Sequence, residues 1–158
     1  MFQISSYGPD ETRRLAQQFA ALLQPGDSVG LTGDLGSGKT VFTSGLCFGL
    51  GYHELTTSPT FTLLHHYPTT PPIYHFDCFR MKYPQEIAAT GFDDYIAAGQ
   101  GIIIVEWAEK IRDYFSDWAY EIDFTFDFDS ELLRVLRFST RRAGYSKRLH
   151  QFLESALK

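Results

Sequence analysis

The spacing of apolar residues along the chain alternates between a helical period and a strand period. Apolar residues recur at helical spacing over 10–23, and a Pro-Gly pair ends this predicted helix. Short apolar runs at 28–32 and 102–105 are typical of buried strands. Apolar and mostly acidic positions alternate over 118–128, which predicts a half-buried strand with one aromatic face.

Weaker patterns complete the set of expected elements. They predict helices over 41–50 and 145–157, two short helices within 84–98 that break at Gly91, and strands over 61–67, 73–79 and 132–138. The last of these strands is expected to pair with 118–128 across a turn at Asp129-Ser130. Because the chain has 158 residues and shows no linker or repeat, we expect residues 1–158 to form a single domain.

Residues 33–40 form a complete phosphate-loop motif, G-x-x-x-x-G-K-T, between a predicted strand and a predicted helix. In such a loop, glycines let backbone N–H groups turn toward phosphate oxygens, and the helix N-terminus adds its positive dipole end. We expect Lys39 to bridge the terminal phosphates and the Thr40 hydroxyl to bind Mg²⁺. The predicted nucleotide contacts are Gly33, Asp34, Leu35, Gly36, Ser37, Gly38, Lys39, Thr40 and Val41.

Charge and composition exclude several classes of protein. The net charge of −5 argues against a protein that coats nucleic acid, and we expect no DNA partner. The first residues lack the basic and apolar regions of a signal peptide, and no run of about 18 apolar residues predicts a membrane span. Cys47 and Cys78 lack metal-site spacing and are more typical of free thiols, so we expect a cytoplasmic protein.

A nucleotide hydrolase needs a carboxylate at the end of a neighbouring strand to hold Mg²⁺ or a water molecule bound to it. Glu106 directly follows the apolar run 102–105, and Asp77 lies near the end of another predicted strand. Asp77 can alternatively be a turn or capping residue. His75 and Asp77 alternate on one strand face, but no third residue has the spacing of a transition-metal ligand.

A hydroxyl-rich loop follows the predicted helix 41–50. Ser58, Thr60 and Thr62 lie in this loop and have the composition of a nucleotide-sensing switch, in which hydroxyl groups contact the γ-phosphate or orient water. An ordinary connecting loop has the same composition, and the sequence leaves both interpretations open.

The residue content also narrows the class of nucleotide-binding protein. The chain contains no asparagine and no lysine followed two residues later by aspartate. It therefore lacks the N-K-x-D motif with which GTPases recognise guanine. We expect the bound base to be adenine instead. Arg80 is the only arginine between the phosphate loop and Glu106, which disfavours a small-molecule kinase with an arginine-bearing lid. No internal arginine finger can be assigned, so we expect slow hydrolysis that depends on a partner.

Charge is segregated towards the C-terminus. Residues 113–131 carry seven acids and no base, whereas residues 134–148 carry six bases and no acid. This pattern predicts either cross-strand ion pairs on a solvated hairpin or a docking surface for a charged partner.

Taken together, four stretches resemble the TsaE (YjeE) family of bacterial ATPases, which act in making threonylcarbamoyladenosine in tRNA. The matching stretches are Gly33–Thr40, Ser58–Leu63, Tyr74–Arg80 and Val105–Lys110. Their order and spacing agree with the family, and the resemblance is good over residues 10–115 and loose beyond them. It implies an α/β fold of the P-loop NTPase type, with three layers and a central, mostly parallel sheet that has antiparallel marginal strands.

The resemblance also implies ATP and Mg²⁺ as ligands, weak hydrolysis by the protein alone, and a partner pair, TsaB and TsaD. In such a system the tRNA is contacted indirectly, and ATP hydrolysis supports repeated turnover. A small-molecule kinase and a nucleotide-gated adaptor without hydrolysis remain the alternatives.

Carried over by position, Lys39, Asp77 and Glu106 are the expected catalytic residues. Thr40 and Glu106 would bind Mg²⁺, Asp77 would act on the metal or its water, and Arg80 and Trp107 would belong to the family's signature motifs. Three positions depart from the family pattern, because Val41, Phe79 and Ser44 stand where threonine, tyrosine and arginine are usual. The first change removes a hydroxyl beside the nucleotide, and the last alters a surface that a partner could contact.

Overall fold

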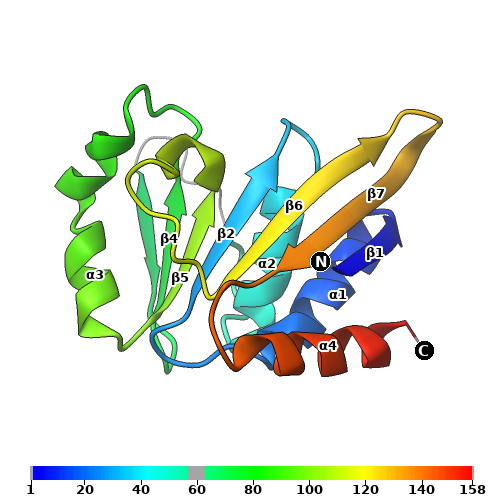
Figure 1. Cartoon of the computed structure of the whole chain (residues 1–158), viewed down its shortest axis with the longest axis horizontal. Helices are drawn as coiled ribbons and strands as arrows, with labels where there is room; N and C mark the ends of the chain where they lie inside the picture. Colours follow the sequence, from blue (N-terminus) through cyan, green and yellow to red (C-terminus); the bar gives the residue numbers. More distant parts are fainter. Residues whose placement is uncertain (1, 57–62, 158) are drawn as a thin grey trace.

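The computed structural model describes residues 2–56 and 63–157, and its core is a seven-stranded mixed sheet (Figure 1). The strands follow the order β1-β7-β6-β2-β5-β4-β3 across the sheet. Their bounds are β1 Phe2–Tyr7, β2 Ser28–Gly33, β3 Leu64–Tyr67, β4 Ile73–Asp77, β5 Ile102–Glu106, β6 Tyr120–Asp127 and β7 Ser130–Ser139.

The centre of the sheet is parallel and both margins are antiparallel. Strand β2 pairs in parallel with β5 and β6, and β5 pairs in parallel with β4. Strand β3 is antiparallel to β4, while β7 is antiparallel to both β6 and β1. The α/β fold expected from the family resemblance is therefore confirmed.

Helices cover both faces of the sheet and make the fold three-layered (Figure 1). The helices are α1 Pro9–Ala20, α2 Lys39–Gly49, α3 Phe92–Ala98 and α4 Tyr145–Ala156, with 3₁₀ turns η1 Pro84–Thr90 and η2 Ala108–Ile111. On one face, α1, α2 and α4 bury a cluster that includes Phe19, Phe42 and Phe138. On the other face, η1, α3 and η2 bury a second cluster around Phe92 and Trp118. Among the described residues, every helix is too short or too polar to span a bilayer.

Three features of the chain differ from the sequence prediction. Strand β1 was not expected, because it buries the polar Ser6 beside Ile4 and so lacks a clear apolar alternation. Helix α2 begins at Lys39 rather than at residue 41, because the phosphate loop enters the helix directly. The aromatic face predicted to run to Phe128 stops before it, since β6 ends at Asp127 and Phe128 is fully exposed in the hairpin turn.

Acidic and basic residues of the charge-segregated C-terminal region form ion pairs. One of these pairs lies across the β6–β7 hairpin, and others lie outside it. Asp123 and Arg137 are directly opposite on β6 and β7, and their charged atoms lie 3.5 Å apart. Glu121 pairs instead with Arg112 at 2.8 Å, outside the hairpin. The ion-pair interpretation accounts for these residues, and the docking interpretation remains a prediction.

Candidate nucleotide-binding site

The phosphate loop connects the most central strand to a partly buried helix. Strand β2 is buried over five of its six residues, so its end is held firmly in the middle of the sheet. Gly33 leaves the strand with φ 133°, and a Cβ atom there would lie 2.4 Å from the Phe124 carbonyl oxygen. Gly38 caps α2 in the left-handed region with φ 108°. Both glycines are therefore required by the backbone path of the loop.

Lys39 folds back into the loop that carries it. Its Nζ donates to the Gly33 carbonyl, to the Asp34 carbonyl at 2.8 Å and to Ser37 Oγ at 3.3 Å. The ammonium also lies 4.0 Å from the centre of the Trp107 ring. Burial lowers the pKa of Lys39 below its ordinary value, and neighbouring carboxylates, Glu109 first among them, oppose that shift.

A threonine hydroxyl and a buried carboxylate meet beside the lysine. Thr40 Oγ1 donates to Glu106 Oε1 at 2.8 Å. Glu106 is 1% exposed, whereas Thr40 is exposed at the start of α2, so this contact connects the sheet interior to the open side of the loop. The other carboxylate oxygen, Oε2, lies 2.6 Å from His75 Nε2. Glu106 therefore has a fixed partner on each of its two oxygens.

Asp77 lies next to Glu106 at the same edge of the sheet, since the two residues are register partners on β4 and β5. The Asp77 side chain is half-buried, and its Oδ1 accepts a hydrogen bond of 3.0 Å from the Phe79 backbone N–H. The carboxylate thus also supports the turn after β4, which agrees with the alternative turn interpretation. Arg80 follows in this turn and is exposed.

Trp107 occupies a strained position between β5 and η2. Its φ is 61°, a left-handed conformation that is uncommon for a bulky residue. The indole ring packs against Phe79 with ring centres 5.0 Å apart, and Lys110 Nζ lies 5.5 Å from the indole centre. This strain places the ring over Lys39, at the phosphate loop.

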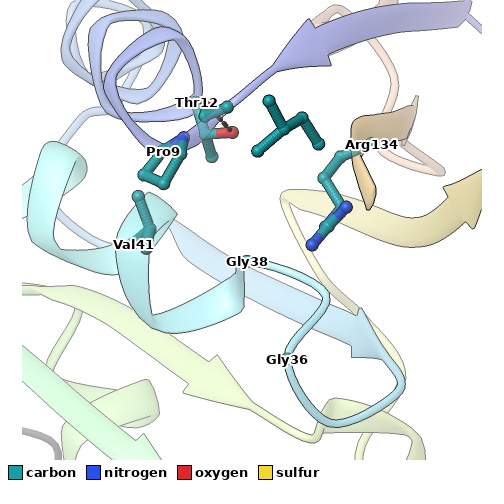
Figure 2. Close-up of a pocket in the computed structure, with 8 residues that line it drawn as sticks. Pro9, Thr12, Gly36, Gly38, Val41 and Arg134 are labelled. Carbon is teal, nitrogen blue, oxygen red and sulfur yellow. Dashed lines mark hydrogen bonds between the residues drawn. The ribbon is translucent and has the colours of Figure 1, made fainter. Parts of the chain in front are cut away.

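Within the part of the chain that the structure describes, two hollows adjoin the phosphate loop. A cleft of about 180 Å³ is lined by the loop residues 35–41 and Trp107. A second cavity of about 130 Å³ lies on the other side of the loop and is lined by Gly8, Pro9, Thr12, Gly36, Gly38, Val41, Leu132 and Arg134. Figure 2 shows Pro9, Thr12 and Val41 on one side of this cavity and the Arg134 side chain on the other. A ligand on the loop can therefore extend to either side of it.

Sequence reasoning did not find the residues that α1 and β7 contribute to the second cavity. Thr12 and Arg134 have no motif around them and are far from residues 33–40 in the sequence. They reach the loop only because α1 packs along α2 and β7 pairs with β6. Thr12 and Arg134 are 122 positions apart in the sequence, so their meeting in one cavity leaves no local signal.

Two further predictions concern the hydroxyl-rich loop and a metal cluster. Ser58, Thr60 and Thr62 lie outside the described residues. Within residues 2–56 and 63–157, no group of three histidine, cysteine, aspartate or glutamate side chains has the arrangement of a metal site. His66 stacks on Tyr74 with ring centres 5.1 Å apart.

Cys47 and Cys78 are free and buried, and burial raises the pKa of each to about 12.

Comparison with known protein families identifies the family to which a chain with this site belongs. The family described as "Threonylcarbamoyl adenosine biosynthesis protein TsaE" matches residues 7–134 of the chain. The chain belongs to the TsaE family. The matched region contains the phosphate loop, both carboxylates and the residues that line the cavity of Figure 2.

Several TsaE relatives cover most of this region. The proteins named "tRNA threonylcarbamoyladenosine biosynthesis protein TsaE" from Bacillus subtilis and Rickettsia felis are 44% and 42% identical over 106 and 105 residues. These matches cover 66% and 65% of this chain, but only 65% and 60% of the two relatives. The Haemophilus influenzae TsaE protein is 37% identical over 118 residues, which are 70% of this chain and 74% of that protein.

A solved structure extends the likeness to nearly the whole chain. The crystal structure of Bacillus subtilis YdiB superposes with a TM-score of 0.80 at 30% identity, and it covers 98% of this chain and 95% of YdiB. Most of β1, the end of β7 and helix α4 lie outside the matched family region in the sequence, and they therefore belong to the same fold as the TsaE core.

Proposed function

We propose that this chain binds ATP with Mg²⁺ and hydrolyses the ATP as the TsaE component of tRNA threonylcarbamoyladenosine biosynthesis. It would act with TsaB-like and TsaD-like partners and contact tRNA only indirectly. The observation that carries the proposal is the contact between Thr40 of the phosphate loop and the buried carboxylate of Glu106. Membership of the TsaE family supplies the biological setting.

The donor atoms at this contact fit a magnesium ion. Mg²⁺ prefers oxygen ligands and usually keeps several water molecules. Thr40 offers an exposed hydroxyl and Glu106 an adjacent carboxylate, both beside the loop in which phosphates would lie. When bound, the ion would neutralise phosphate charge and position the terminal phosphate for attack by water. Asp77, the register partner of Glu106, would hold water at the same edge of the sheet.

The phosphates of ATP would occupy the cleft lined by residues 35–41. Lys39 holds three acceptors of its own loop, and phosphate oxygens can replace those acceptors with charge-assisted hydrogen bonds. The N-terminus of α2 adds its dipole at the same point.

The cavity of Figure 2 would receive the nucleoside end of ATP. It adjoins the phosphate loop at Gly36 and Gly38, and Pro9, Val41 and Leu132 give it a largely apolar wall. Arg134 provides a cation at its rim. An apolar slot with one or two polar groups suits a stacked adenine ring and its ribose.

ATP hydrolysis by the purified protein, with and without a TsaB–TsaD pair, tests the proposal. We expect weak hydrolysis alone and strong stimulation by the pair. Lys39→Ala should abolish productive ATP binding, and Glu106→Ala should abolish hydrolysis while some binding remains. Full hydrolysis by Glu106→Ala would show that Glu106 lacks the proposed role.

The same assay separates the alternatives. ATP binding without hydrolysis, even with both partners present, would identify a nucleotide-gated adaptor. Transfer of labelled phosphate to a small molecule in place of release as inorganic phosphate would identify a kinase. Either result would overturn the proposed ATPase role.

A further inference from the structure

A buried chain of hydrogen bonds runs from the interior of the sheet to the phosphate loop. His75 Nε2 lies 2.6 Å from Glu106 Oε2, and the two side chains are only 1% and 2% exposed. On the other side of Glu106, Oε1 accepts the Thr40 hydroxyl at 2.8 Å. His75 in turn places Nδ1 3.4 Å from the Tyr67 hydroxyl. The chain thus links β3, β4, β5 and α2.

Strand register explains why the histidine reaches the carboxylate. His75 is the register partner of Ile104 on β5, and Glu106 follows Ile104 by two residues. Side chains two residues apart on a strand share one face, so His75 and Glu106 are diagonal neighbours on the same face of the sheet. The face is closed to solvent, because His75 and Ile104 are both buried.

The direction of each hydrogen bond follows from the chemistry of the groups. An ionised carboxylate only accepts, so Glu106 takes the Thr40 O–H at one oxygen and an N–H at the other. The network therefore assigns the proton of His75 to Nε2. That assignment leaves Nδ1 as an acceptor for the Tyr67 hydroxyl.

We propose that His75 is a positioning residue that fixes the Glu106 carboxylate in the orientation needed for Mg²⁺. The inference rests on the proposed function, in which Thr40 and Glu106 bind the ion. A glutamate side chain has three rotatable bonds, and a second anchor at Oε2 removes the freedom that a single contact with Thr40 would leave. His75 touches neither the nucleotide nor the ion in this arrangement, and it acts through Glu106 alone.

The experiment compares two amide substitutions at one position. The amide nitrogen of glutamine reaches about as far as Nε2, whereas that of asparagine reaches only about as far as Nδ1. We expect His75→Asn to raise the Mg²⁺ concentration needed for half-maximal ATP hydrolysis by about 10- to 100-fold, the usual effect of losing a partner of a metal ligand. His75→Gln should recover most of the loss. ATP affinity in EDTA should be unchanged in both variants, because the phosphate loop itself is intact.

The outcomes separate this inference from the proposed function. Wild-type protein that neither binds nor hydrolyses ATP would refute the proposed function. Wild-type protein that does both, together with an unchanged Mg²⁺ requirement in His75→Asn, would refute only the role of His75. Equal losses in the Asn and Gln variants would also refute it, since a specific N–H would then not matter.

A measurement on the wild-type protein keeps the inference testable if the variants do not fold. Nuclear magnetic resonance of ¹⁵N-labelled histidine reports which ring nitrogen carries the proton. We expect the proton of His75 on Nε2, bonded to Glu106, and a shift of that resonance when Mg²⁺ and ATP bind. A proton on Nδ1 alone, or a resonance that Mg²⁺ leaves unmoved, would overturn the assignment.

Discussion

At the scale of single residues, Lys39 holds a positive charge where water is largely excluded. The side chain is 4% exposed, and its ammonium is satisfied by loop acceptors and the face of Trp107. These partners offset part of the free-energy cost of burying the ammonium, but desolvation still lowers the pKa of Lys39. The protein therefore holds the Lys39 ammonium in place at the loop through its own contacts, and the proposed phosphate contact would replace them.

This shift predicts a pH-dependent stability. Between the lowered folded-state pKa and the ordinary value of 10.5, the unfolded chain binds more protons at Lys39 than the folded chain does. The contribution of Lys39 to the free energy of unfolding therefore rises with pH across that window. Urea unfolding should show the wild type gaining stability relative to Lys39→Met as pH approaches 10.5. Parallel curves for the two proteins would contradict the pKa shift.

Single residues also show how far local sequence can identify a site. Lys39 and Thr40 were predicted because the phosphate-loop motif is contiguous, and Glu106 because it directly follows a buried apolar run; the structure brings Thr40 and Glu106 into contact. His75 was noticed, but its partner Glu106 lies 31 positions away and only strand pairing brings them together. The strain at Trp107 had no signal in the sequence, because φ depends on the packing of the loop.

At the scale of elements, close packing of α1 against α2 fixes the phosphate loop from behind. Gly45 on α2 faces α1 so closely that a Cβ atom would lie 2.5 Å from the Arg13 carbonyl and 2.6 Å from Ala16 Cβ. Gly49, one turn further, meets Ala20 in the same way, with 2.7 Å to its Cβ. Small residues at four-residue spacing on both helices let their backbones approach.

Gly45→Ala should therefore destabilise the fold, although alanine is the better helix former. The added methyl group must push α1 away, and overpacking of this kind costs about 1–3 kcal/mol. Thermal or urea unfolding measures the effect. Ser44→Ala, at the neighbouring and half-exposed position, is the control and should change stability by less than about 0.5 kcal/mol. A neutral Gly45→Ala would show that the helix contact is looser than the structure indicates.

Helices and strands whose apolar residues follow a clear pattern were predicted well, and elements without such a pattern were missed. The buried strand β5 and the break between η1 and α3 at Gly91 follow directly from an apolar run and a glycine. Strand β1 was missed, because an edge strand that buries a serine carries too little apolar contrast. Its position is decided by pairing with β7, more than 120 residues later.

At the scale of the whole molecule, a buried aspartate joins the C-terminal helix to the rest of the fold. Asp27 is 1% exposed and accepts from the Tyr145 hydroxyl at 2.6 Å and from the Gln24 N–H at 2.8 Å. The Arg142 guanidinium lies 4.0 Å away. Helix α4 thus attaches at the end of the sheet opposite the phosphate loop (Figure 1).

Tyr145→Phe should lower the free energy of unfolding and leave the affinity for ATP, proposed above, unchanged. Loss of the hydroxyl leaves a buried carboxylate oxygen short of a donor, and such a change costs about 1–3 kcal/mol. Unfolding experiments measure the loss, and an ATP titration checks that affinity is unchanged. Tyr7→Phe is the matched control for stability, because Tyr7 is 67% exposed. A Tyr145→Phe protein as stable as the control would show that Asp27 does not anchor α4.

The sequence by itself determined the phosphate loop, the strand and helix around it, and the carboxylate of Glu106. These features depend on neighbouring residues, whose spacing fixes both the backbone conformation and the side of the sheet on which a side chain emerges. The sequence also carried enough of the TsaE motifs to indicate the family, which the comparison then confirmed.

Only the tertiary structure decided which residues surround the phosphate loop and Glu106. It brought Arg134 and Thr12 to one cavity, set His75 against Glu106, and folded Lys39 beneath Trp107. Each of these contacts joins residues that are distant in the chain, and each depends on strand register or on how closely two helices approach. Such contacts follow from the packing of the whole molecule, where many weak interactions compete, so no short stretch of sequence encodes them.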